Sequence, residues 1–196
     1  MSTPSPHFPY PPSNFSMYKL LIFRSSESDQ DTPALVCENT EALIEQIPDA
    51  SLTASSYHDL TGADHGPIRS RFATLNDGIG IGAWAAGHDD TIPWIQAEFL
   101  SVKTISKVAT KGRNGNRPRQ WVTKYQLKYG LAGNEADFEY VTSSAAEGGD
   151  MITFNGNSDQ DTVVENEFST IFAQFFRLYP TEWVGHISLR WEVYGC

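Results

Sequence analysis

The chain has 196 residues, enough for one domain with a sizeable core, and 12% of them are aromatic. Its formal net charge of −10 argues against nucleic-acid binding and against simple attraction to anionic membranes, because both depend on Lys and Arg. No apolar run approaches the roughly 18 residues that a membrane-spanning helix needs.

The first part of the chain differs in composition from the rest. Residues 1–16 (MSTPSPHFPYPPSNFS) contain five prolines and are predicted to be disordered or polyproline-like. Residues 17–36 combine one short apolar run with SSESDQD and look like a linker or pro-segment. They show no charged start followed by a long apolar stretch, so no ordinary signal peptide is predicted. We expect a Pro/Ser-rich tail over 1–36 and one folded domain over 37–196.

From Cys37 onward the pattern predicts strands and turns, with one short helical candidate, ENTEALIEQI (38–47), which has room for little more than a single turn. Turn clusters separate the strand candidates at a spacing of about 10–15 residues, which is typical of an antiparallel sandwich or barrel. The strand candidates are 51–57, 94–100, 104–112, 121–130, 136–141, 150–156, 161–168, 173–180 and 186–195. In the second of them, Ile95, Ala97 and Phe99 share one face.

The two cysteines, Cys37 and Cys196, either pair or remain free thiols in a reducing compartment. A last residue is poorly placed for packing but well placed to hold a chain end, which favours pairing. The bond would close nearly the whole domain, and its chain-entropy contribution would be roughly 5 kcal/mol at most. Disulfides persist in oxidising compartments, so pairing would indicate an extracellular protein.

A search for catalytic motifs finds no GxSxG, no HExxH and no phosphate-binding loop, so no enzyme is predicted. Histidines adjoin carboxylates at His58-Asp59, Asp64-His65 and 88–90, where a metal or polar ligand could bind, or where the loops are simply solvated. The stretch NGNSDQD (155–161) resembles the start of a calcium loop, but it lacks the required glycine, and an Asn/Asp-rich turn explains it better.

Two further turns stand out. RNGNRPRQ (113–120) is the densest positive patch, and its arginines suit carboxylate, sulfate or sugar hydroxyls, unless the turn is only a solvated hairpin. GIGIG (78–82) reads as an exposed turn that carries Ile79 and Ile81, one of which could instead fold into the core.

Five stretches, in order, resemble a known family: SLTASS (51–56), WIQAEF (94–99), KVATKGRNGNRPRQWVTKYQLKYG (107–130), FNGNSDQDTVVEN (154–166) and YPTEWVGHISLRWEVYGC (179–196). Together they resemble the discoidin domain, also called the coagulation factor 5/8 C-type domain, over residues 37–196. The resemblance implies an all-β fold, a distorted jelly-roll β-sandwich or barrel of about eight core antiparallel strands. It also implies a disulfide between Cys37 and Cys196, which match the family's first and last residues.

The resemblance places ligand-binding loops at one end of the fold, here residues 57–65, 76–82 and 112–119, with the turn 87–91 beside them. It implies a binding module without catalysis. The candidate ligand-binding residues are Tyr57, His58, Leu60, His65, Asp77, Ile79, Asp89, Arg113, Arg117 and Arg119. Asp77 would accept hydrogen bonds from sugar hydroxyls and Arg113 would donate them.

The five tryptophans and two charged residues of the last strand are expected to be structural. Trp84 follows the second loop at a strand start and is expected in the core, which leaves no clear loop Trp to stack on a sugar. The other four are expected in the core or at its rim: Trp94, Trp121, Trp183 and Trp191. Arg190 and Glu192 are expected to serve structural pairing.

Members of this family differ in ligand, since some bind phosphatidylserine membranes, some galactose-type sugars, and others collagen or a C-terminal arginine. We expect a carbohydrate-binding, lectin-like adhesion module whose partner is a cell-surface glycan or glycoprotein. The alternatives are a protein or peptide held by Asp89 and Tyr57, and a phospholipid membrane contacted through Leu60 and Ile79. No cofactor is expected to be required, and calcium is left open. Weak sugar sites gain avidity by clustering, which fits an oligomer or a larger parent protein, secreted or at the cell surface.

Overall fold

The computed structural model describes residues 37, 39–58, 64–78, 80–143 and 149–196. The predicted tail over 1–36 lies outside the described residues, as do the candidate site residues Leu60 and Ile79. No helix in the described part of the chain is long and apolar enough to cross a bilayer.

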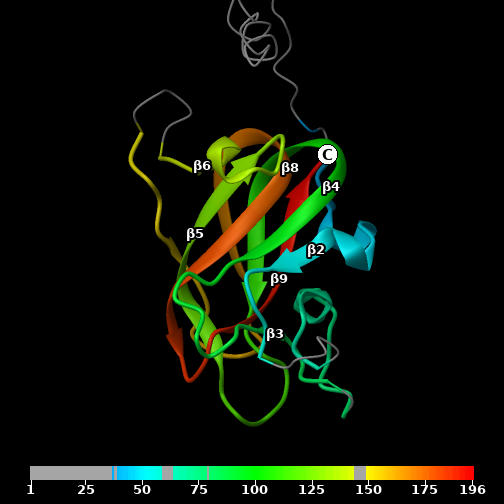
Figure 1. Cartoon of the computed structure of the whole chain (residues 1–196), viewed down its shortest axis with the longest axis vertical. Coiled ribbons are helices and arrows are strands. Elements are labelled where there is room, and N and C mark those ends of the chain that lie inside the picture. The colour runs from blue at the N-terminus through cyan, green and yellow to red at the C-terminus, as the bar shows by residue number, and fades with distance from the viewer. Residues whose placement is uncertain (1–36, 38, 59–63, 79, 144–148) are drawn as a thin grey trace, which may run out of the picture. The chain divides into compact units, whose positions relative to one another are not determined.

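The described residues form an antiparallel β-fold, which confirms the predicted all-β class (Figure 1). One path of hydrogen-bonded strands runs in the order β1-β9-β4-β8-β5-β6, while β2 pairs with β4, β3 with β9 and β7 with β5. The strands are β1 (Glu41–Ala42), β2 (Leu52–Ala54), β3 (Trp84–Ala85), β4 (Ile95–Lys111), β5 (Trp121–Gly130), β6 (Glu139–Tyr140), β7 (Phe154–Asn155), β8 (Val164–Val184) and β9 (Ser188–Gly195). Short 3-10 turns connect them: η1 (Ile44–Gln46), η2 (Asp49–Ser51), η3 (Pro67–Ser70) and η4 (Glu135–Asp137).

The two longest strands correct the predicted boundaries. Residues 94–100 and 104–112 were expected as separate strands, but both belong to β4, and 161–168 and 173–180 likewise merge into β8. The β4–β8 pairing shifts register between Glu98 and Lys103 and then resumes. A bulge therefore absorbs the residues whose pattern suggested a break.

The helical candidate 38–47 forms a short strand and a single turn, not an α-helix. Leu43, Ile44 and Ile47 are buried in the core. The Glu192 carboxylate accepts hydrogen bonds from the backbone N–H of Ile44 at 2.6 Å and of Glu45 at 3.3 Å, and so fixes the turn. Tertiary contacts thus outweigh the local helical pattern.

A row of aromatic side chains runs through a core that is otherwise mostly aliphatic. Ring contacts run from Tyr125 through Phe154, Phe168 and Phe176 to Trp191, with centroids 5.6–6.3 Å apart. Burial of each such side chain stabilises the fold by about 1.5–3 kcal/mol. The predicted apolar face of β4 is confirmed, because its three residues 95, 97 and 99 are at most 1% exposed.

The tryptophan predictions hold with one exception. Trp84 and Trp191 are fully buried, and Trp94 and Trp121 are partly buried. Trp183 is wrong as a core residue because it is 46% exposed. It is the second-last residue of β8, where it pairs with Val122 of β5.

A disulfide joins Cys37 to Cys196, as the family resemblance implied, with the two Cα atoms 5.8 Å apart. The C-terminal residue also exchanges two backbone hydrogen bonds of 2.9 Å with Thr104 of β4. A Cβ on Gly195 would lie 2.0 Å from the Thr104 carbonyl oxygen, so only glycine allows this approach. The two ends of the domain therefore meet at one end of the sheet.

Candidate functional site

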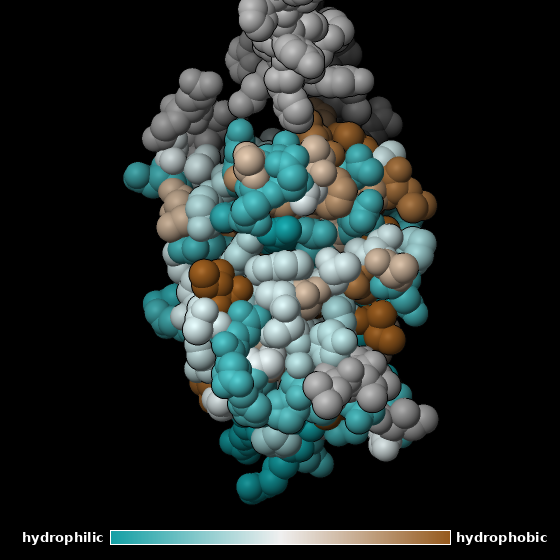
Figure 2. All heavy atoms as spheres, viewed as in Figure 1, coloured by the Kyte–Doolittle hydropathy of each residue, from teal (hydrophilic) through white to brown (hydrophobic). Residues whose placement is uncertain are grey.

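The described parts of the three predicted loops meet at the end of the sheet opposite the disulfide (Figure 1). Three backbone hydrogen bonds of 3.0–3.1 Å tie the first loop to the second and to β3: His58 N–H to the Ala85 carbonyl, Ala85 N–H to His65, and Ile81 N–H to Asp64. Hydrophilic side chains gather over this end of the molecule (Figure 2). The loops therefore form one polar surface.

The second and third loops also touch directly. Asn114 donates its backbone N–H to the Gly82 carbonyl at 2.9 Å, and its Oδ1 accepts the Asn76 N–H at 3.0 Å. A Cβ on Gly82 would lie 2.5 Å from the Cβ of Asn114. This close approach requires glycine, so the two loops share one packed interface.

Four histidines form a cluster at this end, which we call the four-histidine cluster: His58, His65, His88 and His186. Its ring centroids are 4.7 Å apart for His58–His65, 4.6 Å for His58–His88, 4.8 Å for His88–His186 and 5.9 Å for His58–His186. The predicted candidates His58 and His65 thus come together with His88, which the sequence singled out beside its carboxylate neighbours, and with His186, which it did not. No pattern in the sequence brings His186, which lies in the β8–β9 turn, to the first loop.

His186 is held firmly within this cluster. Its Nε2 lies 2.7 Å from the Ala86 carbonyl oxygen. Burial lowers the pKa of His186, and the positive charges of His88, His65 and Arg113 lower it further. The hydrogen bond to Ala86 acts in the opposite direction and raises the pKa. Neutral imidazole is therefore the favoured form at this position.

Arg113 is connected to the start of β9 through Gln120, whose side-chain oxygen also accepts the hydroxyl of Ser188, two residues after His186, at 3.2 Å. The Nη1 of Arg113 donates to the Gln120 side-chain oxygen at 2.9 Å, and burial lowers the pKa of its guanidinium. The Nε of Arg113 is buried and has no hydrogen-bond partner among the described residues. Arg117 and Arg119, on the same loop, are exposed.

Asp77 is engaged at the base of the second loop. It pairs with Arg69 Nη1 at 3.2 Å and accepts the Gly80 N–H at 3.0 Å. Arg69 also donates to the carbonyls of Leu75 at 2.8 Å and Ile81 at 3.0 Å. The pair therefore shapes the loop, and sequence reasoning missed Arg69 because it lies on η3, outside the loop.

The turn 87–91 is anchored through Asp90, while Asp89 is exposed. The Asp90 carboxylate accepts hydrogen bonds from the hydroxyls of Ser55 and Ser56 and from the Ile92 N–H. Tyr57, the next residue in the first loop, is 37% exposed. Its ring is therefore accessible, and the residue directly precedes His58 of the four-histidine cluster in the chain.

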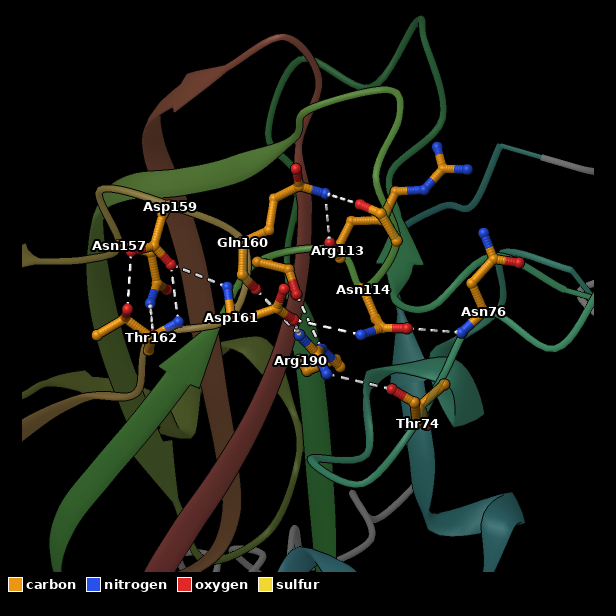
Figure 3. A network of polar contacts seen from close by, with 12 residues as sticks. Thr74, Asn76, Arg113, Asn114, Asn157, Asp159, Gln160, Asp161, Thr162 and Arg190 are labelled. Carbon is orange, nitrogen blue, oxygen red and sulfur yellow. Dashed lines mark hydrogen bonds and ion pairs between the residues drawn. The ribbon is translucent and has the colours of Figure 1, made fainter.

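A network of polar contacts connects the bases of the loops to β9 (Figure 3). Arg190 of β9 is 2% exposed and donates to the carbonyls of Gly112 at 2.8 Å, Gln160 at 3.0 Å and Thr74 at 3.2 Å. It also pairs with Asp161 at 3.0 Å. Arg190 and Glu192 are both structural, as expected, but each binds its own partners and the two do not pair with each other in these contacts.

The stretch 155–161 forms a turn, as the sequence favoured. The Asp159 carboxylate accepts from the N–H groups of Asp161 at 2.9 Å and Thr162 at 2.7 Å, and from the Thr162 hydroxyl at 2.7 Å. These bonds lower the pKa of Asp159. In the described part of the chain, no three His, Cys, Asp or Glu side chains are arranged to hold a metal ion.

A groove lies on the side of β5 and β8 and extends to Thr91 and Ile92, next to the turn 87–91. It encloses about 570 Å³ and includes Trp94, Lys128, Glu135, Tyr140 and Tyr179 in its lining. Lys128 Nζ lies 4.7 Å from the Tyr140 ring centroid and 5.1 Å from that of Tyr179. These cation–π contacts occupy the aromatic rings within the protein.

The chain is similar to known proteins in both sequence and fold. The sequence model of the F5/8 type C domain matches residues 51–193. EGF-like repeat and discoidin I-like domain-containing protein 3 of Mus musculus is 32% identical over 151 residues, covering 76% of this chain and 31% of that protein. Lactadherin of Rattus norvegicus is 33% identical over 153 residues, covering 76% of this chain and 34% of that protein. The chain therefore spans about a third of the length of these relatives.

Two solved structures show the same fold. Discoidin II from Dictyostelium discoideum superposes with a TM-score of 0.63 at 28% identity, covering 82% of this chain and 59% of that chain. CpGH89CBM32-5 from Clostridium perfringens, solved in complex with GalNAc-β-1,3-galactose, has a TM-score of 0.54 at 19% identity, covering 80% of this chain and all of that chain, 100%.

Proposed function

Because the chain belongs to the F5/8 type C, or discoidin, domain family, whose members are binding modules and not enzymes, we propose that its loop end binds a galactose-type glycan. The observation that carries the proposal is the packing of four imidazoles from three separate segments into one cluster, with the arginine-bearing third loop joined to the second loop. Sugar sites combine planar hydrogen-bonding groups with a small apolar platform.

Each of these groups would make a different kind of hydrogen bond with a sugar. Arg113 has donors in a planar fork, and its buried Nε has no partner among the described residues. A neutral imidazole both donates and accepts, so the cluster suits sugar hydroxyls, which do the same. The exposed carboxylate of Asp89 adds an acceptor at the same turn as His88. Trp84 takes no part, because it is buried and donates its indole N–H to the Ser56 carbonyl at 3.0 Å.

The proposal also covers the location of the protein and the nature of its partner. The Cys37–Cys196 disulfide supports a secreted or cell-surface location, because such bonds persist in oxidising compartments. We propose a cell-surface glycan or glycoprotein as partner and a role in adhesion. A single weak site would gain avidity in an oligomer or a longer protein. The galactose-type complex of the Clostridium perfringens module is a precedent for such ligands on this fold.

A glycan array probed with the oxidised protein, in calcium and again in chelator, tests the proposal. We expect binding to galactose-terminated glycans that Arg113→Ala abolishes. Lys124→Ala is the control, since it also removes one cation but lies on β5, where it pairs with Glu182 at 2.9 Å. Equal loss in both variants would refute the specific role of Arg113, and a blank array from folded protein would refute the sugar-binding assignment.

A phospholipid surface is the second candidate, favoured by two exposed apolar side chains next to the loops, Leu75 at 61% and Ile92 at 69% exposed. The net charge of −10 opposes it. Co-sedimentation with phosphatidylserine vesicles separates the two candidates. Vesicle binding that Leu75→Ser and Ile92→Ser remove, together with a blank array, would transfer the assignment to lipid. A blank result in both assays would favour a protein or peptide ligand at Asp89 and Tyr57.

A further inference from the structure

The four-histidine cluster joins three segments that are far apart in the chain. His58 and His65 come from the β2–β3 connection, His88 from the β3–β4 connection and His186 from the β8–β9 turn. Adjacent rings lie 4.6–4.8 Å apart, with His58 and His186 at 5.9 Å. Every histidine of the chain from residue 37 onward belongs to this cluster.

Histidine is the side chain whose ordinary pKa lies closest to neutral pH, so imidazoles packed together make a site that can respond to protons. Neutral imidazoles can pack against one another at these distances, whereas protonated imidazoles repel one another. At His186, burial and the positive charges of His88, His65 and Arg113 lower the pKa and favour the uncharged form.

The other titratable groups around the cluster are few among the described residues. Asp64 and Tyr57 belong to the same connection as His58 and His65, and Asp89 and Asp90 to the turn of His88. The Asp90 carboxylate already accepts two serine hydroxyls and one backbone N–H. For His186, the charges that shift its pKa are those of His88, His65 and Arg113, all of the same sign. Asp59, next to His58 in the chain, lies outside the described residues.

We propose that the four-histidine cluster makes ligand binding proton-linked: the neutral cluster holds the loop segments in the binding arrangement, and protonation separates them and releases the ligand. The inference rests on the proposed function, because it concerns regulation of the same site. The protein would bind near pH 7.5 and release in an acidic compartment.

The sign follows from the direction of the pKa of His186, which is lowered in the folded protein. A base whose folded pKa is lowered takes up more protons when the structure opens. Its stabilising contribution is therefore complete above the ordinary histidine value of about 6.5 and is lost as the pH falls through the lowered value. Each proton taken up on release weakens binding by at most about tenfold per pH unit.

Two measurements in chelator-containing buffers test the inference. Capture on immobilised galactose is measured from pH 7.5 to 5.5, and the melting temperature is followed over the same range. For the wild type we expect a loss of affinity of about fivefold for each linked proton between pH 6.5 and 5.5, short of the limiting tenfold because a histidine with the ordinary pKa is already half protonated at pH 6.5, with a parallel fall in melting temperature. His88→Gln and the double variant His58→Gln/His88→Gln, both at exposed positions, should flatten both profiles. Lys124→Gln on β5 should leave both profiles as in the wild type.

The outcomes separate this inference from the proposed function. Binding with a flat pH profile would overturn proton linkage and leave sugar binding standing. If galactose captures no protein at any pH, the sugar assignment fails, and the melting profiles alone decide. Parallel wild-type and double-variant melting profiles would then overturn the inference, whereas a steeper acid loss in the wild type would support it.

Discussion

Replacement of Arg190 with methionine tests how the loop end is held together. The side chain is 2% exposed and donates to three backbone carbonyls, those of Gly112, Gln160 and Thr74, at 2.8–3.2 Å. These carbonyls belong to three different connections, so one guanidinium ties them together. Methionine keeps much of the packing of the aliphatic stem but has no donor.

The magnitude follows from the bonds lost. The bond to the Gly112 carbonyl is buried and those to Thr74 and Gln160 are partly buried. The loss of a donor costs about 1–1.5 kcal/mol at the buried carbonyl and less at the two that water can reach, so the total is about 2–4 kcal/mol of unfolding free energy. The ion pair with Asp161 adds little, because that carboxylate is 66% exposed and such pairs contribute at most about 1 kcal/mol. Most of the effect should therefore come from the carbonyls and little from the charge.

Urea denaturation followed by tryptophan fluorescence measures this difference. Asp161→Asn is the matched control, since it removes the charge but keeps an oxygen that can accept from Arg190, and it should cost less than about 1 kcal/mol. The reasoning would be refuted if Arg190→Met cost less than about 1 kcal/mol, or if the control were equally damaging.

Three further predictions follow from single contacts. Cys196→Ala opens the disulfide and should lower the free energy of unfolding by about 2–5 kcal/mol, measured by denaturation against the oxidised wild type; an unchanged midpoint would contradict it. Gly82→Ala places a Cβ 2.5 Å from the Cβ of Asn114, so it should separate two loops and weaken glycan capture more than it lowers the melting temperature; equal capture would show that the loops need not touch. The hydrogen bond from Arg177 lowers the pKa of Glu135, so the ion pair stabilises the fold above about pH 4.5 and this stabilisation is lost as the pH falls below that value. Glu135→Gln should therefore reduce the acid-dependent loss of unfolding free energy by at most about 1 kcal/mol. Identical stability profiles for the variant and the wild type would refute this.

Local pattern was enough to predict the fold class and much of the core. Alternation of apolar residues reports directly which face of a strand is buried, and Ile95, Ala97 and Phe99 are buried as expected. Strand 121–130 coincides with β5 because its pattern is uninterrupted and turns bound it on both sides. The pairing of Cys37 with Cys196 came from the family resemblance, since the residues alone left free thiols open.

Only the tertiary structure decided which side chains meet. The merging of two predicted strands into β4 depends on a bulge that its partner β8 accommodates. Arg69 reaches Asp77 from η3, and His186 reaches His88 from a turn nearly a hundred residues away in the chain. Periodicity describes each element by itself, whereas these contacts depend on the register between elements and on the paths of the connections. The sequence by itself therefore determined an all-β domain, and the family resemblance placed the loops that carry His58, His65, His88 and Arg113 at one end. The fold decided that His186 joins them and that the four imidazoles pack against one another, because these contacts depend on the paths of the connections.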